Sequence, residues 1–154
     1  MKNKSTLIIS ILIPLLVGGL SALLSSNGMM IYNSTANKPP LTPPDIVFPI
    51  VWTILYILMG ISSYIAYNEK NLFTPIALKW YSIQLFFNFC WPLLFFNLMM
   101  YLTAFILLIL MIISILIMMY YFYKIKPAAA YLQIPYVLWC IFAAYLNLNT
   151  YLLN

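Results

Sequence analysis

Five long apolar runs constrain this chain more than any other feature. They occupy residues 5–26, 45–67, 75–97, 101–123 and 127–150, and each is close to the ~20 residues that a helix needs to cross a bilayer. Of the 154 residues, 66% are hydrophobic and 6% are charged, whereas a soluble domain has about a quarter of its residues charged. We therefore predict an all-α membrane protein, a single domain over residues 1–154 built as a bundle of five transmembrane helices.

The first run has two possible interpretations. It begins with Lys2 and Lys4 and carries a weak small-residue site at 22–25, as a cleaved signal peptide does. Its apolar stretch, residues 7–24, is longer than the usual hydrophobic core of such a peptide, so we interpret it as a retained span. Between the third and fourth runs, the segment 97–101 is so short that the two helices must be antiparallel neighbours. Asp45, at the start of the second run, is expected to cap its helix.

The lysines predict the orientation of the chain in the membrane. With five spans, the amino terminus and the second and fourth loops lie on the same side of the membrane. The other side has a single lysine, Lys38. The lysines of the first side are Lys2, Lys4, Lys70, Lys79, Lys124 and Lys126. Because cytoplasmic loops are enriched in basic residues, we predict a cytoplasmic amino terminus, with the first loop and the carboxyl end outside. Exclusive use of lysine as the basic residue and heavy use of Ile and Asn favour a bacterial plasma membrane.

The scarcity of charged and reactive residues argues against several kinds of chemistry. The chain has no histidine, and its two acidic residues, Asp45 and Glu69, are far apart in sequence. We therefore expect no catalytic triad, no paired-carboxylate hydrolase, no metal site and no cofactor. Seven scattered lysines form no basic face for nucleic acid. Cys90 and Cys140 both fall within apolar runs, and we interpret them as small buried residues.

Polar and aromatic residues recur at helical spacing on three of the predicted helices. The three stripes are Trp52, Tyr56, Gly60 and Ser63; Gln84, Asn88, Trp91 and Phe95; and Pro135, Trp139, Ala143 and Asn147. Because polar side chains are costly in lipid, such faces point into the bundle. Together they predict a cavity with aromatic walls and a few hydrogen-bonding groups, which suits a flat, mostly apolar ligand.

Simpler interpretations of the same residues stay open. Gln84 and Asn88 could serve only to join helices through hydrogen bonds. Aromatic residues near the ends of spans could belong to the interfacial belt where a bilayer meets water. The residues to which this second interpretation applies are Trp80, Tyr81, Tyr120, Tyr121 and Tyr123.

The first loop and the three stripes also carry the sequence patterns of a known family. In chain order the matching segments are Lys38-Pro-Pro-Leu-Thr-Pro-Pro, Val51-Trp-Thr-Ile-Leu-Tyr-Ile-Leu-Met-Gly60, Gln84-Leu-Phe-Phe-Asn88 with Trp91, and Pro135-Tyr-Val-Leu-Trp139 with Phe142-Ala-Ala-Tyr-Leu-Asn147. They resemble the patterns K-P-P-W-T-P-P, V-W-T-x-L-Y-x-x-M-G, Q-L-x-L-N and P-Y-x-x-W of the TspO/translocator protein family, also called tryptophan-rich sensory or peripheral benzodiazepine receptor proteins. The resemblance covers nearly the whole chain.

The resemblance implies a five-helix bundle, commonly a homodimer, whose pocket lies beneath the first loop and accepts porphyrins and isoquinoline-type molecules. Together with the stripes it gives the expected ligand-binding residues: Tyr32, Trp52, Tyr56, Asn88, Trp91, Trp139 and Ala143. The expected lid over the pocket consists of Lys38, Pro39, Pro40, Leu41, Thr42, Pro43 and Pro44.

The chain departs from the family pattern in three places. Leu41 stands where the family has Trp, so one aromatic wall of the lid is expected to be lost. Pro92 replaces the usual Ser after Trp91, which is expected to change the bend of the third helix. No Lys or Arg follows Ala144, so the cholesterol-recognition pattern of animal members is absent and no cholesterol partner is expected.

Three functions remain open at this point. In the first, the protein is a receptor or sensor that holds a protoporphyrin IX-like tetrapyrrole between Trp52 and Trp139, with Asn88 bonding a ring substituent and Lys38 meeting a propionate. In the second, the same pocket degrades protoporphyrin by light-dependent oxidation, with Trp52 and Trp139 as the catalytic, oxidisable residues. The third, transport of a tetrapyrrole or a membrane lipid, is disfavoured because the chain shows no internal repeat.

Overall fold

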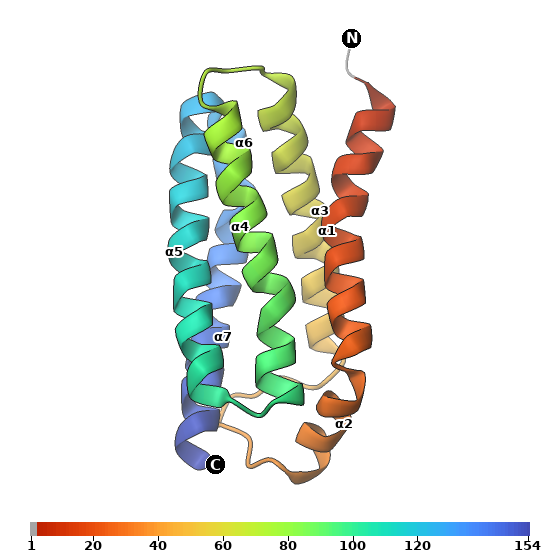
Figure 1. The fold of residues 1–154 in the computed structure, drawn as a ribbon, viewed down its shortest axis with the longest axis vertical. Coiled ribbons are helices and arrows are strands. Elements are labelled where there is room, and N and C mark those ends of the chain that lie inside the picture. The colour runs from red at the N-terminus through yellow and green to blue at the C-terminus, as the bar shows by residue number, and fades with distance from the viewer. Residues whose placement is uncertain (1–2) are drawn as a thin grey trace.

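The computed structural model describes residues 3–154, so Lys2 lies outside the described residues. The chain forms an elongated bundle of helices (Figure 1). In chain order these are α1 (Lys4–Leu24), α2 (Ser26–Thr35), α3 (Val47–Asn68), α4 (Thr74–Pro92), the π-helical turn η1 (Leu93–Asn97), α5 (Tyr101–Ile125), α6 (Pro127–Tyr131) and α7 (Ile134–Leu153).

Five of these helical stretches run the length of the bundle. By length and composition, α1, α3, α5 and the α6–α7 stretch Pro127–Leu153 can each cross a membrane. α4 lies alongside them as the fifth (Figure 1). It is less apolar because it carries Lys79, Gln84 and Asn88, of which Gln84 and Asn88 are buried inside the bundle. The prediction of an all-α bundle of five membrane helices is confirmed.

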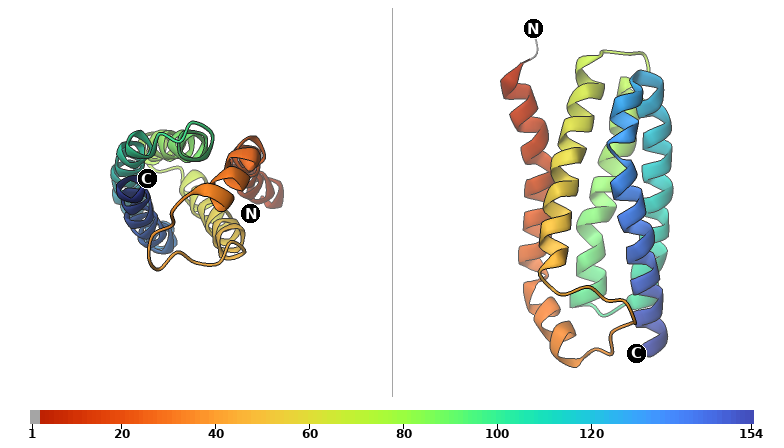
Figure 2. Two further views of the ribbon diagram at one scale, coloured as in Figure 1. Left: turned by 90° about the horizontal axis from the view of Figure 1, so that it is seen from below. Right: turned by 180° about the vertical axis from the view of Figure 1, so that it is seen from behind.

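The helices pack as a ring that the first loop crosses at one end. α1 packs mainly on α3, and both α4 and α7 pack mainly on α5; Figure 2 shows the ring from below, with the first loop passing across it. As predicted, the short segment after η1 makes α4 and α5 antiparallel neighbours. The α1–α3 contact depends on Gly60, because a Cβ there would collide with the backbone of Ile11; small residues of this kind let membrane helices approach closely.

The first loop contains a helix, α2, that the sequence analysis did not predict. Its ten residues are rich in Ser, Asn and Thr, which are weak helix formers. Tertiary contacts hold it in place: Gly28 lies directly against the backbone of Phe96 in η1, and the Asn97 amide donates a 2.9 Å hydrogen bond to the carbonyl of Leu24. The helix therefore forms because it packs on η1 and not because of its own propensity.

The predicted capping role of Asp45 is wrong. α3 begins one residue later than such a cap requires, so that Ile46 occupies the cap position and no side chain bonds the free N–H groups. The Asp45 carboxylate instead lies 3.6 Å from the Lys38 ammonium within the first loop.

Prolines lie close to the points where α4 and the run 127–150 are interrupted. Pro92 ends α4, and the π-helical turn η1 follows it directly. The run 127–150 divides into α6 and α7 at Leu132 and Gln133, and Pro135 sits in the first turn of α7. A proline there leaves no hydrogen bond unmade, because the first turn of a helix has no acceptor for its N–H groups.

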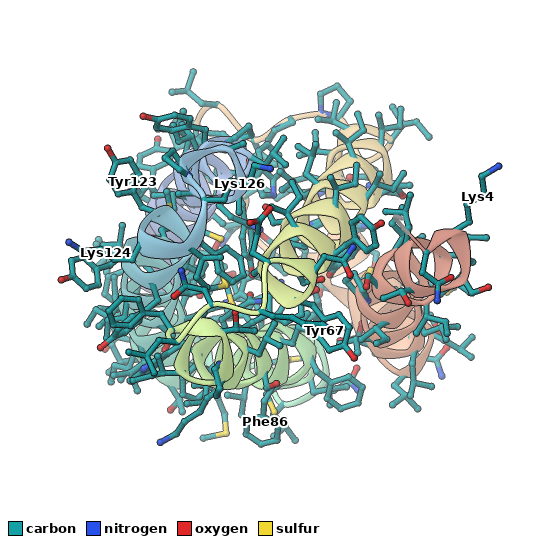
Figure 3. All side chains as sticks on the ribbon, turned by 90° about the horizontal axis from the view of Figure 1, so that it is seen from above. Lys4, Tyr67, Phe86, Tyr123, Lys124 and Lys126 are labelled. Carbon is teal, nitrogen blue, oxygen red and sulfur yellow. The ribbon has the colours of Figure 1, made fainter. Side chains whose placement is uncertain are left out.

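The described lysines lie mostly at one end of the bundle. Figure 3 looks onto the end opposite the first loop. Lys4 lies on one side of the bundle there, and Lys124 and Lys126 lie on the other. Lys126 forms an ion pair of 3.2 Å with Glu69. Lys38 belongs to the first loop at the other end, which is the charge separation on which the predicted orientation rests; the orientation itself stays a prediction.

Candidate ligand-binding cavity

A cavity of about 490 Å³ lies inside the bundle beneath the first loop. Its walls come from α1, α3, α4, α5, α7 and η1, and α2 and the first loop close it. The volume lies in the range of roughly 300–1,000 Å³ that is usual for small-molecule sites. Each ligand-binding residue expected from the sequence lines this cavity: Tyr32, Trp52, Tyr56, Asn88, Trp91, Trp139 and Ala143.

Two indoles on different helices form the aromatic walls. Trp52 on α3 stacks on Tyr56 with ring centroids 5.5 Å apart and an angle of 26° between the planes. Trp139 on α7 meets Phe48 edge to face, with centroids 5.8 Å apart. Neither indole is fully buried, and both line the cavity. A flat apolar molecule inside would therefore contact indole surface from two helices.

Asn88 is the centre of a chain of hydrogen bonds that joins α3, α4 and α7. The Tyr56 hydroxyl donates to Asn88 Oδ1 at 2.8 Å, and Asn88 Nδ2 donates to the Tyr136 hydroxyl at 2.9 Å. Tyr136 in turn donates to Gln84 Oε1 at 2.6 Å. We call these four residues the polar ladder. The interpretation in which Gln84 and Asn88 join helices is thus correct, and Asn88 lines the cavity as well.

A second polar bridge ties Trp91 to the start of α5. The Trp91 indole N–H donates to Asn147 Oδ1 at 2.9 Å, and Asn147 Nδ2 donates to the carbonyl of Tyr101 at 2.8 Å. The indole also stacks on Phe95, with centroids 4.8 Å apart. Because its N–H is already used, Trp91 offers a ligand an apolar face only.

The first loop is fastened to α7 by contacts that close the cavity. The Tyr32 hydroxyl lies 3.2 Å from Thr150 Oγ1, and burial raises the pKa of Tyr32 above its ordinary value, an effect that this contact partly opposes. The Asn154 amide accepts from the Asn37 N–H at 3.1 Å and donates to the Asn37 carbonyl at 3.0 Å. The Tyr145 hydroxyl donates to the carbonyl of Pro40 at 3.1 Å.

Lys38 stands at the mouth of the cavity. Its ammonium lies 3.6 Å from Asp45 and 5.8 Å from the centre of the Tyr32 ring. Lys38, Thr42 and Asp45 all line the cavity. Of these three, Asp45 was not among the expected lid residues.

Several lining residues were not expected from the sequence, among them every lining residue on α1. Gly18 faces Tyr56 so closely that a Cβ there would overlap the phenol ring. Gly18 and Ala22 have the spacing of small residues at contacts between membrane helices, and this spacing alone does not indicate a cavity. Phe48 and Ser21 were missed as well, and Ser21 donates a 2.7 Å hydrogen bond to the carbonyl of Phe89.

Other expectations for aromatic and reactive residues have mixed outcomes. Tyr81, assigned to the interfacial belt, is buried instead, whereas Tyr120 and Tyr123 are exposed on the bundle surface. Cys90 and Cys140 are free thiols; Cys140 is fully buried, as expected, whereas Cys90 is only partly buried. Within residues 3–154, no group of three or more His, Cys, Asp or Glu residues is placed to hold a metal ion.

Comparison with known proteins agrees with this architecture. The sequence profile of the TspO/MBR family matches residues 10–152. The chain belongs to the TspO/MBR family. It is 34% identical to the tryptophan-rich protein TspO of Archaeoglobus fulgidus over 153 residues, which is 99% of both chains. It is also 34% identical to the tryptophan-rich sensory protein of Cereibacter sphaeroides over 77% of this chain and 73% of that one, and to the human translocator protein over 71% and 67%.

This TspO/MBR protein departs from the expected lid at Leu41. The residue has a left-handed backbone with φ of 68°, and its side chain is 78% exposed. Neither Leu41 nor the four prolines of the lid line the cavity, whereas Lys38 and Thr42 do. The prolines stiffen the loop, and Tyr32 supplies the aromatic surface on the lid side.

Proposed function

We propose that this protein is a membrane receptor that binds a tetrapyrrole of the protoporphyrin IX type in the cavity beneath the first loop. One observation carries the proposal: Trp52 and Trp139, from two different helices, line one mostly apolar cavity whose wall also contains the buried amide of Asn88. Membership of a family whose members carry names such as tryptophan-rich sensory protein supports a receptor role. Isoquinoline-type molecules, which are also flat and apolar, would bind at the same place.

The mouth of the cavity suits a ligand with a carboxylate. We propose that a propionate displaces Asp45 from Lys38, because both groups would compete for one ammonium. The gain is small, about 1 kcal/mol or less, since the pair is partly exposed. Lys38→Met should therefore weaken protoporphyrin binding a few-fold and leave binding of its dimethyl ester unchanged. Equal losses for acid and ester would rule out this role of Lys38.

The test of the proposed function is a titration with protoporphyrin IX in detergent, in the dark, followed by porphyrin absorbance. Trp52→Phe and Trp139→Phe should each weaken binding about 3- to 10-fold, because one aromatic contact contributes roughly 0.5–1.5 kcal/mol. Trp80→Phe is the matched control, since Trp80 lies outside the cavity lining. Unchanged affinity in both cavity variants would contradict the proposal, and so would an equal loss in the control.

A second candidate function is light-dependent oxidation of the bound porphyrin, with dissolved molecular oxygen as the oxidant. The stacking of Trp52 on Tyr56 supports it, because an indole oxidised next to the excited porphyrin would have a second oxidisable ring in contact. Illumination of the complex should then bleach the porphyrin faster than detergent alone, and Trp52→Phe should slow the bleaching more than its loss of affinity explains. Binding without faster bleaching leaves the receptor function. Transport of tetrapyrrole or lipid remains the least favoured proposal.

We also propose that the protein works as a homodimer, as the family resemblance implies. The surface of α1 is a candidate contact, because its exposed residues are almost all apolar. The molecular mass of the protein–detergent complex, corrected for detergent, measures this directly. A mass near the 17.8 kDa of one chain would contradict the homodimer.

A further inference from the structure

Four buried polar atoms lie in the half of the bundle farther from the first loop. Among residues 3–154, the buried side-chain atoms without a hydrogen-bond partner are Tyr81 Oη, Gln84 Nε2, Gln133 Nε2 and Gln133 Oε1. Gln84 and Gln133 have no solvent-exposed surface at all. Unpaired polar groups are unfavourable in any protein interior and more so within a membrane, where no bulk water can reach them. Their concentration in three residues therefore requires an explanation.

The register of two helices places the residues that carry these atoms at neighbouring levels of the bundle. The bond between Gln84 and Tyr136 sets α4 against α7, and both helices run away from the end that carries the α3–α4 turn (Figures 1 and 2). Tyr81 precedes Gln84 by three residues, and Gln133 precedes Tyr136 by three. Three residues are close to one helical turn, so Tyr81 and Gln133 both lie one turn nearer that end of the bundle. None of these four residues lines the ligand cavity.

The chemistry of the cluster selects a neutral partner that both donates and accepts. Gln84 Nε2 and Gln133 Nε2 are donors, Gln133 Oε1 is an acceptor, and the Tyr81 hydroxyl can act as either. None of these groups is ionised, so neither a cation nor an anion would be compensated there. Water satisfies both kinds of group, and it binds where two to four polar partners surround a space large enough for one molecule.

We propose that Tyr81, Gln84 and Gln133 form an internal water site at the buried end of the polar ladder. Water bound there provides a hydrogen-bond partner for Gln84 Nε2, the ladder atom that has none among the protein groups. The ladder then runs as an unbroken chain of hydrogen bonds from Tyr56 in the cavity wall to water in the opposite half of the membrane. The site is separate from the ligand cavity, and the proposal does not depend on which ligand the cavity binds.

The direct test is a crystal structure of the full chain, without ligand, at a resolution that shows ordered water. We expect at least one water within hydrogen-bonding distance of the Gln133 amide and of Tyr81 or Gln84. Repacked side chains that pair these atoms with one another, or a dry cluster, would overturn the proposal.

A second test uses the sign of a stability change. Gln133→Met replaces the amide with an apolar group of similar length. If water occupies the site, the variant removes hydrogen-bond partners from that water and from the other polar groups. The midpoint of thermal unfolding in detergent should then fall by roughly 2–8 °C. If the site is dry, the variant removes an unpaired amide, and the midpoint should rise. Ile115→Met is the matched control, because Ile115 is equally buried and apolar; a Gln133→Met midpoint equal to or above that of the control would overturn the proposal.

Discussion

At the scale of single residues, the cavity depends on small side chains as much as on its aromatic ones. Tyr56 can stack on Trp52 and bond Asn88 only because Gly18 on α1 leaves room for its ring. Gly19, the next residue, also lies in the cavity lining, but it is exposed and a Cβ there would meet no atom within 4 Å. The position of the phenol in the cavity wall is thus set by the helix opposite and not by α3 alone.

The two glycines give a matched pair of variants. Gly18→Ala should displace the Tyr56 ring, reduce ligand affinity and lower stability by about 1–3 kcal/mol, because the added methyl group overlaps the ring. Gly19→Ala, which adds a methyl group into open space, should be neutral or stabilising by up to about 1 kcal/mol, since alanine is the better helix former. Thermal unfolding and a ligand titration of both variants check this. Equal stability of the two variants would contradict the close contact between Gly18 and Tyr56.

At the scale of elements, α7 serves as both a wall and an anchor. Its middle contributes Trp139 and Ala143 to the cavity, and its last turns hold the first loop through Tyr145, Thr150 and Asn154. The loop itself is stiff because of its four prolines. Opening the cavity therefore means releasing the loop from the end of α7 as a unit, and not bending it locally.

Weakening this anchor should speed the release of a bound ligand. Asn154→Ala removes two side-chain hydrogen bonds to Asn37. Because both are exposed, each should contribute near the lower end of about 0.5–1.5 kcal/mol, so the dissociation rate should rise about 5-fold. Asn149→Ala is the control, because its amide bonds only the carbonyl of Tyr145 within α7. Stopped-flow displacement of bound porphyrin measures both rates. If the control accelerates release as much as Asn154→Ala does, the loop contact is not the restraint.

At the scale of the whole molecule, the bundle has two ends of different chemistry. The first loop, α2 and the carboxyl end of the described chain gather at one end (Figure 1), where Lys38 is paired with Asp45. The opposite end carries Lys4, Lys70, Lys124 and Lys126. This asymmetry is the physical basis of the predicted orientation.

Cysteine labelling in intact cells tests the orientation. In a background without Cys90 and Cys140, Leu41→Cys and Leu72→Cys place thiols at two exposed positions, 78% and 89% accessible, at opposite ends. A membrane-impermeant maleimide should label Leu41→Cys in intact cells and Leu72→Cys only after lysis. The reverse result would show that the amino terminus faces outward.

Helical spacing was sufficient to predict the aromatic and polar stripes that three helices contribute to the cavity, but little of what surrounds them. The stripes through Trp52, Asn88 and Trp139 were readable because polar and aromatic residues stand out in apolar helices. Helix α2 could not be predicted from its own residues, because its stability comes from packing on η1. Tyr136 was missed as a ladder residue for a similar reason: it is one aromatic among many, and only its contact with Gln84 distinguishes it.

The polar ladder has a consequence for the kinds of molecule that the cavity can recognise. The three hydrogen bonds of the ladder all run from Tyr56 towards Gln84, so the Tyr56 hydroxyl, whose proton is already used, presents lone pairs to a ligand. Rotating the Asn88 and Gln84 amides by 180° exchanges their oxygen and nitrogen atoms and reverses each bond, after which Tyr56 presents its proton. The Tyr56 hydroxyl can therefore accept a hydrogen bond from a pyrrole-like N–H or donate one to a carbonyl oxygen. The site then selects a ligand by its shape and tolerates either kind of polar group.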